Sequence, residues 1–244
     1  MIEIKDVMKS FENKNVLNHL NVTISSGSIF GLIGPNGAGK STLLYLLNGI
    51  SKCDEGSILF DGKDVYENPD VKKDILFISD DPYYFHFATI DEMKDFYLTF
   101  YPQFNLETYQ HYVDLFRLPQ NKPLKYYSKG MKRQAMFALA LAIAPKYLLL
   151  DEPEVSLSPA NQVALAQEIN ELTHYLGCQF IIATHSPFML GTLNAKIYNL
   201  DAREYEVTPW YKLENVRYFY DFFKKHEKEF NDWVLFFFTL LTNH

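Results

Sequence analysis

Residues 28–42, SIFGLIGPNGAGKST, decide the fold of this chain. The apolar run at 28–33 predicts a buried strand, and the segment 41–48 that follows has helical character. Between them, residues 34–41 match the pattern G-x-x-x-x-G-K-[ST] in the strand-to-helix context that this pattern requires. The matching residues, with the threonine that follows, are Gly34, Pro35, Asn36, Gly37, Ala38, Gly39, Lys40, Ser41 and Thr42.

The residue types of this glycine-rich loop suit a nucleoside triphosphate. Glycines let backbone N–H groups turn inward around phosphate oxygens, and the start of the following helix adds a positive dipole end. We expect Lys40 to reach the β- and γ-phosphates and the Ser41 hydroxyl to bind Mg²⁺. The sequence therefore predicts a site for a nucleoside triphosphate and Mg²⁺.

The composition is that of a globular chain. Of its 244 residues, 48% are hydrophobic and 22% are charged, which argues against a disordered or collagen-like chain. The net charge of −7 disfavours broad electrostatic binding to nucleic acid. Cys53 and Cys178 lie far apart in the sequence, so neither a disulfide scaffold nor a zinc cluster is expected.

The order of the predicted elements indicates an α/β fold. Two alternating runs before residue 27 predict an antiparallel β opening, which leaves no room for a secretory signal. Further apolar runs predict strands at 74–79, 147–150 and 180–183. Such strands, alternating with helices, are typical of a mostly parallel sheet covered on both faces. We predict a P-loop NTPase core of mostly parallel sheet, with an N-terminal antiparallel β subdomain and a helical subdomain inserted at about 82–145.

Polar residues follow two of these strands. Asp151 and Glu152 come directly after 147–150, where a Mg²⁺ on a phosphate loop needs its second protein anchor. We expect Asp151 to bind the metal, through a coordinated water, and Glu152 to act as general base on the attacking water. His185 follows the strand at 180–183 and is expected to contact the γ-phosphate from the same sheet edge.

Residues 127–134, YSKGMKRQ, resemble the signature motif of ABC ATPases. Together with the other motifs, they make residues 1 to about 190 similar to an ABC ATPase in motif order and spacing. The resemblance implies ATP hydrolysis by a dimer, with ATP held between the phosphate loop of one subunit and the signature of the other. It implies that Ser128 and Gly130 contact the γ-phosphate in trans and that Phe11 stacks on adenine; a plain hydrophobic strand residue is the alternative for Phe11.

Several positions depart from the pattern usual in transporter ATPases. Asp80, followed by Asp81, stands where most carry glutamine, so Asp80 would approach Mg²⁺ or the attacking water as a charge. The signature has Lys129 and Met131 where glycine and glutamine are commoner. Ser158 replaces the usual aspartate after the acid pair, and from about residue 153 the chain looks closer to stand-alone ABC-type ATPases. A natural mosaic and an engineered chimera are both open interpretations.

Two functions fit these motifs. The first is the ATP-binding, ATP-hydrolysing subunit of an ABC exporter, cytoplasmic and peripheral on the inner face of the cell membrane. It would form a homodimer, or a heterodimer with another ABC ATPase, and power a separate permease that docks on the helical subdomain. The alternative is a soluble ABC-type ATPase of the DNA repair, chromosome-maintenance or defence branch, which the acidic net charge disfavours. A domain that binds ATP without hydrolysing it is disfavoured by the intact Lys40, Asp151, Glu152 and His185.

The aromatic and the basic residues of the helical subdomain are both given a structural interpretation. Its aromatic residues, from Tyr83 to Phe116, are expected mostly to fill its own core, and any exposed remainder would count as a docking site. They include Tyr83, Tyr84, Phe85, Phe87, Phe96, Tyr97, Phe100 and Tyr101. The basic residues around the signature are interpreted as a solvated helix start: Lys122, Lys125, Lys129, Lys132 and Arg133.

The chain is expected to divide into an ABC ATPase domain at 1–210 and a C-terminal extension at 211–244. Residues 215–230 have an amphipathic helical pattern, and we expect that helix to pack on the sheet core. The apolar run WVLFFFTLL at 233–241 is about half as long as a bilayer-spanning helix needs to be, and is expected to be buried.

Overall fold

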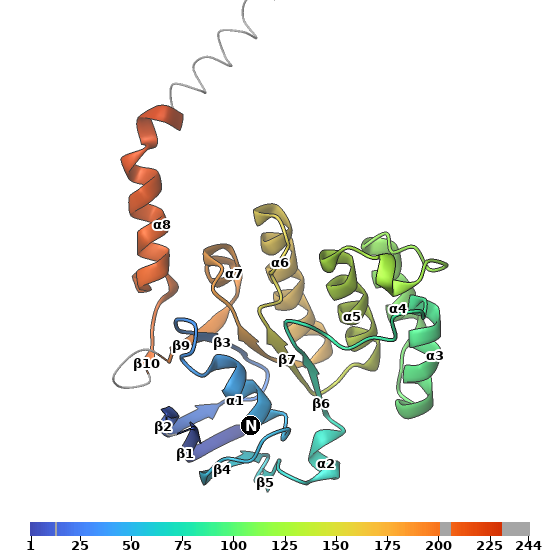
Figure 1. The fold of residues 1–244 in the computed structure, drawn as a ribbon, viewed down its shortest axis with the longest axis horizontal. Helices are drawn as coiled ribbons and strands as arrows, with labels where there is room; N and C mark the ends of the chain where they lie inside the picture. Colours follow the sequence, from blue (N-terminus) through green and yellow to red (C-terminus); the bar gives the residue numbers. More distant parts are fainter. Residues whose placement is uncertain (13, 201–205, 231–244) are drawn as a thin grey trace, which may run out of the picture.

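Two β-sheets and a set of helices make up the computed structural model, which describes residues 1–12, 14–200 and 206–230 (Figure 1). The strands are β1 (Ile2–Phe11), β2 (Lys14–Ile24), β3 (Ile29–Ile33), β4 (Glu55–Phe60), β5 (Lys63–Asp64), β6 (Ile75–Ile78), β7 (Tyr147–Asp151), β8 (Gln179–Ala183), β9 (Ala195–Asn199) and β10 (Glu206–Val207). The α-helices are α1 (Lys40–Leu47), α2 (Pro69–Lys72), α3 (Ile90–Phe100), α4 (Leu106–Leu115), α5 (Lys129–Ile143), α6 (Pro159–Leu176), α7 (Pro187–Thr192) and α8 (Glu214–Lys225).

The larger sheet has the strand order β10-β9-β3-β8-β7-β6 and is parallel except where β10 pairs with β9. Every residue of β3, β7 and β8 is buried, because α1 and the smaller sheet cover one face and α5, α6 and α7 cover the other. This confirms the mostly parallel sheet that the continuous apolar runs predicted.

The smaller sheet is antiparallel, with the order β2-β1-β4-β5. β1 pairs with both β2 and β4, so the predicted antiparallel opening of the chain is confirmed. The inward side chains of this sheet share one apolar core with α1 and with one face of the larger sheet. That core fixes the position of α1, and hence of the glycine-rich loop before it.

Helices α3, α4 and α5 form the inserted helical subdomain, called the lobe below (Figure 1). Helix α3 begins at a capping box, in which the Thr89 side chain accepts from the Glu92 N–H and the Glu92 carboxylate accepts from the Thr89 N–H. The lobe has a core of its own, in which Ile90 and Met93 supply the inward face of α3. Helices α4 and α5 also contribute Tyr112, Phe137 and Ala138 to the core on the larger sheet, so the lobe packs directly against the sheet.

Seven of the twelve aromatic residues from Tyr83 to Phe116 lie in or against an apolar core, six of them in or against that of the lobe, as expected. Tyr109, Tyr127 and Phe104 occupy much of that core together with aliphatic side chains. The other five aromatic residues of that range are exposed and form the remainder that would count as a docking site: Tyr83, Phe85, Phe87, Phe96 and Phe100.

The expectation that the C-terminal helix packs on the sheet core is wrong. Leu213 and Val216 reach an apolar cluster with Ile33 and Leu190, but beyond this first turn α8 extends away from the body (Figure 1). Its apolar face is exposed and includes Phe219, Tyr220, Phe222 and Phe223. The apolar run at 233–241 lies outside the described residues. Within the described ranges, no helix is long and apolar enough to cross a membrane.

Asp61 joins the two sheets at the turn after β4. Its Oδ1 accepts a hydrogen bond from the Met1 ammonium at 2.6 Å, and its Oδ2 accepts from Lys146 Nζ at 2.6 Å and from the Tyr147 hydroxyl at 2.9 Å. The hydrogen bond from Lys146, followed by that from the amino terminus, holds the pKa of Asp61 well below its usual range. The pairing connects the start of the chain and the smaller sheet to the first residue of β7.

We predict that Asp61→Asn lowers the melting temperature at pH 7 by no more than about 3 °C, since the partners are half exposed and exposed ion pairs are weak. A carboxyl whose folded-state pKa is depressed stabilises the protein above its unfolded pKa of about 4, and that stabilisation is lost as the pH falls through the folded pKa. The difference between wild type and Asp61→Asn should therefore narrow below about pH 4. Thermal melts across pH measure this, with the exposed Asp70→Asn as control; a difference that stays constant with pH contradicts it.

Candidate active site

Three predicted motifs meet at the carboxyl edge of the larger sheet, because β3, β8 and β7 are neighbours. The register pairs Leu32 of β3 with Ala183 of β8, and Ala183 with Asp151 of β7. The glycine-rich loop follows β3, the acid pair ends β7, and His185 follows β8. Residues far apart in the sequence are thus brought to one site by strand pairing alone.

The glycine-rich loop is shaped by its backbone. Gly39 precedes α1 with φ +96°, and a Cβ built there would lie 3.0 Å from side-chain atoms of Val16 and Leu17, so only glycine fits. Lys40 is buried, and its Nζ donates to the carbonyl oxygens of Gly34 at 2.9 Å and Pro35 at 3.3 Å. The loop therefore curls around its own lysine and holds an ammonium group inside it.

Lys40, Ser41 and Asp151 form one electrostatic unit. Burial lowers the pKa of Lys40, and the carboxylates of Glu152, Asp151 and Glu154 oppose that shift. Burial raises the pKa of Asp151, while a hydrogen bond from the Ser41 side chain opposes that increase. Two of the three residues predicted at the Mg²⁺ site, Ser41 and Asp151, thus lie next to each other. Thr42 follows them, half-buried, in the first turn of α1.

Glu152 and His185 face each other across the site. Glu152 has φ +47°, a strained backbone conformation for a non-glycine residue, and its N–H donates to the Ala183 carbonyl oxygen at 2.9 Å. Its Oε1 lies 3.6 Å from His185 Nε2, which is buried and has no hydrogen-bond partner among the described residues. Burial, and then the charge of Lys40, lower the pKa of His185, so its imidazole is neutral at pH 7.

These groups fit a phosphate and a metal ion. A buried ammonium, an imidazole nitrogen that lacks a partner and a loop of backbone N–H groups are all donors that a phosphate would satisfy. No cluster of three or more His, Cys, Asp or Glu in the described part of the chain could hold a metal by itself. Ser41 and Asp151 therefore suit Mg²⁺, which usually completes its shell with phosphate oxygens and water.

Four other predicted site residues lie outside this cluster. Asp80 is exposed, two residues after β6, and its charge raises the pKa of Asp151. Ser128 caps α5 by accepting from the Met131 N–H at 3.2 Å, and Gly130 lies in the first turn of α5, so both belong to the lobe. Phe11 ends β1 in the smaller sheet and is 51% exposed.

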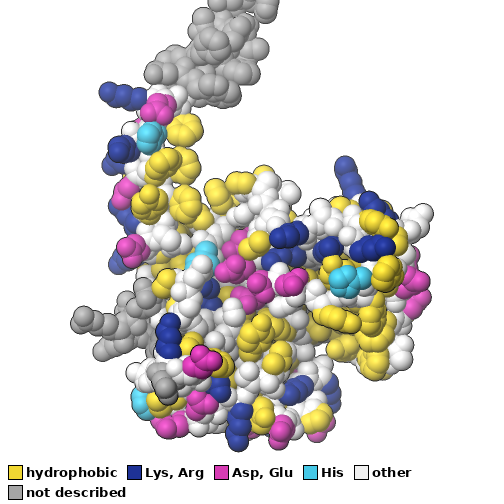
Figure 2. Space-filling model, in the orientation of Figure 1, with side chains coloured by type: hydrophobic (Ala, Val, Ile, Leu, Met, Phe, Trp, Pro, Cys, Tyr) yellow, Lys and Arg dark blue, Asp and Glu magenta, His cyan; other side chains and the backbone are white. Residues whose placement is uncertain are grey.

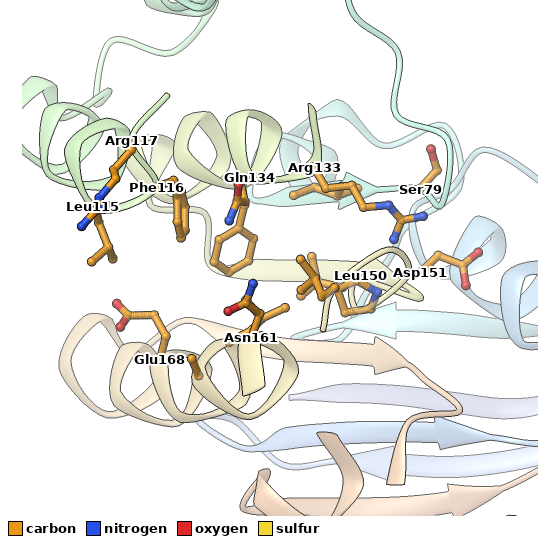
Figure 3. Close-up of a pocket in the computed structure, with 16 residues that line it drawn as sticks. Ser79, Leu115, Phe116, Arg117, Arg133, Gln134, Leu150, Asp151, Asn161 and Glu168 are labelled. Atoms are coloured by element: carbon orange, nitrogen blue, oxygen red, sulfur yellow. The ribbon is translucent and has the colours of Figure 1, made fainter. Parts of the chain in front are cut away.

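Arg133 does not belong to the solvated helix start that the sequence suggested, because its side chain has fixed hydrogen-bond partners. Its Nη1 donates to the Glu152 carbonyl oxygen and its Nη2 to the Asp80 carbonyl oxygen. A pocket lies between α4 and α5 of the lobe on one side and β7 and α6 on the other (Figure 3). The Arg133 side chain reaches from α5 toward the end of this pocket where Ser79 and Asp151 lie. The pairing spans 19 and 53 residues of sequence, so no local pattern predicts it.

Two further residues of the turn after the acid pair were not assigned a role from the sequence. Ser158, at the place of the usual aspartate, caps α6 by accepting from the Asn161 N–H at 3.3 Å. Glu154 is a buried carboxyl group whose Oε1 hydrogen-bonds the His185 loop. A serine before proline at a helix start is a readable capping signal. A glutamate three residues after a strand end carries no signal of burial.

We predict that Arg133→Lys lowers Mg-ATP turnover about tenfold with little change in nucleotide affinity, because one ammonium cannot replace a planar fork that donates to two separate loops. Steady-state turnover and equilibrium nucleotide binding measure the two effects. Arg117→Lys, at an exposed arginine on the same lobe, is the matched control. Wild-type turnover in Arg133→Lys contradicts the role given to the fork.

Sequence comparison identifies the family. Residues 17–155 match the family model described as ABC transporter. The lantibiotic transport ATP-binding protein SrtF of Streptococcus pyogenes is 33% identical over 192 residues, which cover 76% of this chain and 80% of SrtF. The ABC transporter ATP-binding protein YtrB of Bacillus subtilis is 35% identical over 154 residues, which cover 63% of this chain and only 52% of YtrB.

Solved structures support the same fold. CbiO1 of Clostridium perfringens, described as part of an ABC transporter complex, superposes with a TM-score of 0.72 at 23% identity and covers 86% of this chain and 89% of its own. A dimeric ATP-binding cassette bound to ADP and Pi gives a TM-score of 0.73 at 21% identity, with 85% and 98% covered. These two structural similarities show the fold alone, and the sequence matches show the family to which the chain belongs. The chain belongs to the ABC transporter ATP-binding proteins, the family of ATP-hydrolysing subunits of ATP-driven transporters.

Proposed function

We propose that this chain is the ATP-hydrolysing subunit of an exporter, peripheral on the cytoplasmic face of the cell membrane. The observation that carries the proposal is the convergence of Lys40, the Ser41–Asp151 pair and the Glu152–His185 pair on one sheet edge. Export is favoured by the likeness to SrtF, whose name describes lantibiotic transport. PotA of Haemophilus influenzae, named for spermidine/putrescine import, is 32% identical over 203 residues, 81% of this chain and 54% of PotA.

The residues of the glycine-rich loop bind the triphosphate in this proposal. Backbone N–H groups of residues 34–39 surround the phosphates, and Lys40 moves its ammonium group from the loop carbonyls to the β- and γ-phosphates. The Ser41 hydroxyl and the Asp151 carboxylate hold Mg²⁺, with Asp80 close enough to add negative charge. When bound, Mg²⁺ supplies neutralisation of the charge that develops on the phosphate oxygens.

Glu152 and His185 carry out the proton and phosphate chemistry. Glu152 accepts a proton from the attacking water, since its carboxylate is partly exposed at the site and its backbone is held by hydrogen bonds to Ala183 and Arg133. The neutral imidazole of His185 donates a hydrogen bond from Nε2 to the γ-phosphate. This requires the tautomer protonated at Nε2, which the missing partner at that nitrogen leaves available.

A second ATPase subunit completes the site. Ser128 and Gly130 begin α5 on the lobe, outside the sheet-edge cluster, so they are free to contact ATP bound by a partner subunit. Phe11, exposed at the end of β1, stacks on adenine. The partner is an identical chain or another ABC ATPase, and ATP-driven closure of the pair is a population shift toward the closed state.

An exposed row of aromatic side chains on the lobe supports a permease docking surface. Tyr83, Phe85, Phe96 and Phe100 follow one another, with neighbouring ring centroids 5.0 to 5.8 Å apart. Hydrophobic side chains gather over the lobe and along α8 on the face drawn in Figure 2. An exposed apolar patch of this kind marks a protein contact, and a cytoplasmic helix of a separate permease is the partner that the proposed function requires.

The first test is phosphate release from purified protein with Mg-ATP over a range of protein concentrations. We expect turnover that rises more than linearly with concentration, and a loss of about 100-fold or more in Glu152→Gln with ATP binding retained. Glu171→Gln, at an exposed carboxylate on α6, is the control. Turnover that is linear in concentration contradicts the self-dimer and favours a partner chain, and full activity in Glu152→Gln contradicts its role as base.

A second test addresses the aromatic row. We predict that Phe96→Ser combined with Phe100→Ser leaves basal turnover within about twofold, as surface changes usually do, but releases the protein from native membranes. Membrane fractionation of cells that carry the permease measures the release. Tyr175→Ser, at a tyrosine 79% exposed on α6, is the matched control. Unchanged membrane association in the double variant would rule out docking through this row.

A further inference from the structure

A buried hydrogen-bond network lies directly beneath the His185 loop and centres on Glu154. The Glu154 side chain is 7% exposed. Its Oε1 accepts from the Thr184 hydroxyl at 2.5 Å and from the backbone N–H of His185 at 3.1 Å. One carboxyl oxygen thus fixes the backbone at the residue whose ring faces Glu152.

The network continues to the turn after the acid pair. Thr184 Oγ1 accepts from the Ser186 N–H at 3.1 Å, and the Ser186 hydroxyl donates to Gln162 Oε1 at 2.6 Å. Gln162 Nε2 in turn donates to the Leu157 carbonyl oxygen at 2.9 Å. The two loops that follow β7 and β8 are therefore tied together by side chains at both ends of the turn 154–157.

Burial of the Glu154 carboxyl group is energetically unfavourable, so its hydrogen bonds have to compensate for that cost. Burial raises the pKa of Glu154, and its Oε2 is buried without a hydrogen-bond partner among the described residues. A threonine or a small apolar residue would fill a turn without that cost. What the glutamate supplies is an acceptor oxygen that reaches two donors of another loop, including the N–H of His185 itself.

We propose that Glu154 is a positioning residue for His185, and that its Oε1 holds the His185 backbone so that the ring stays aimed at Glu152 and the reacting phosphate. The inference deepens the proposed function, because it rests on a role for His185 in hydrolysis. In this role, the turn after the acid pair is connected to His185 by a direct hydrogen bond. Glu154 itself touches neither nucleotide nor water in this role.

The test compares two variants of similar size that differ in the acceptor. Glu154→Gln keeps an oxygen at Oε1, so we expect kcat within about threefold of wild type; Glu154→Leu removes it, and a misplaced histidine should lower kcat about 100-fold with KM nearly unchanged. Gln179→Leu is the matched control, since Gln179 is a buried polar residue at the opposite end of β8. Equal losses in both Glu154 variants, or a loss confined to KM, overturn the proposal.

A double-mutant cycle separates this proposal from the function on which it rests. In a His185→Ala background, Glu154→Leu should cost no further kcat, because the group that it positions is gone. Independent, multiplicative losses would overturn the positioning role while leaving His185 catalytic. Full turnover in His185→Ala alone would instead overturn the proposed role of His185. If Glu154→Leu does not fold, the isosteric Thr184→Val is measured in the same cycle. It removes the other hydrogen bond that holds Glu154 Oε1 in place, together with the bond that Thr184 Oγ1 accepts from the Ser186 N–H.

Discussion

The parallel pairing of β3, β8 and β7 is the constraint on which the rest of the molecule depends. These strands are buried along their whole length, so a one-residue slip would place polar strand ends in the core and apolar side chains at the site. The register that avoids this also pairs Asp151 with Ala183 of β8, and it pairs Ala183 with Leu32 of β3, just before the glycine-rich loop. The same strand register therefore buries the sheet and aligns the site residues.

The site gathers charges at a depth where each would be unfavourable alone. Burial opposes the charged form of Lys40, and it equally opposes ionisation of Asp151. Each charge is compensated. The Lys40 ammonium donates hydrogen bonds to loop carbonyl oxygens and lies near carboxylates, and Asp151 accepts a hydrogen bond from the Ser41 hydroxyl. In the proposed function, a triphosphate with Mg²⁺ would bring further opposite charges to the same groups, and its binding would add to the compensation that these groups already have.

Local patterns in the sequence predicted most of the fold and the centre of the site, because strand burial, helix starts and the phosphate loop depend on neighbouring residues. The contacts of Arg133 and Glu154 could not be predicted, since their partners lie 19 to 53 residues away. For α8 the periodicity correctly indicated an amphipathic helix. Periodicity shows that a helix has an apolar face, however, and not which surface covers it.

The two unpredicted side chains connect the parts that an ATP-driven subunit has to coordinate. Arg133 ties the lobe, which carries the signature, to the backbone of Glu152 and Asp80. Glu154 ties the turn after Glu152 to the loop of His185. Through these bonds, a rotation of the lobe bears on the carbonyl of Glu152, and a shift of the turn bears on the histidine. The lobe is thus joined to the sheet edge both by the apolar packing of α5 and by the hydrogen bonds of Arg133. In the proposed function, nucleotide binding would shift the population toward the lobe position in which these contacts and those to the nucleotide are made together.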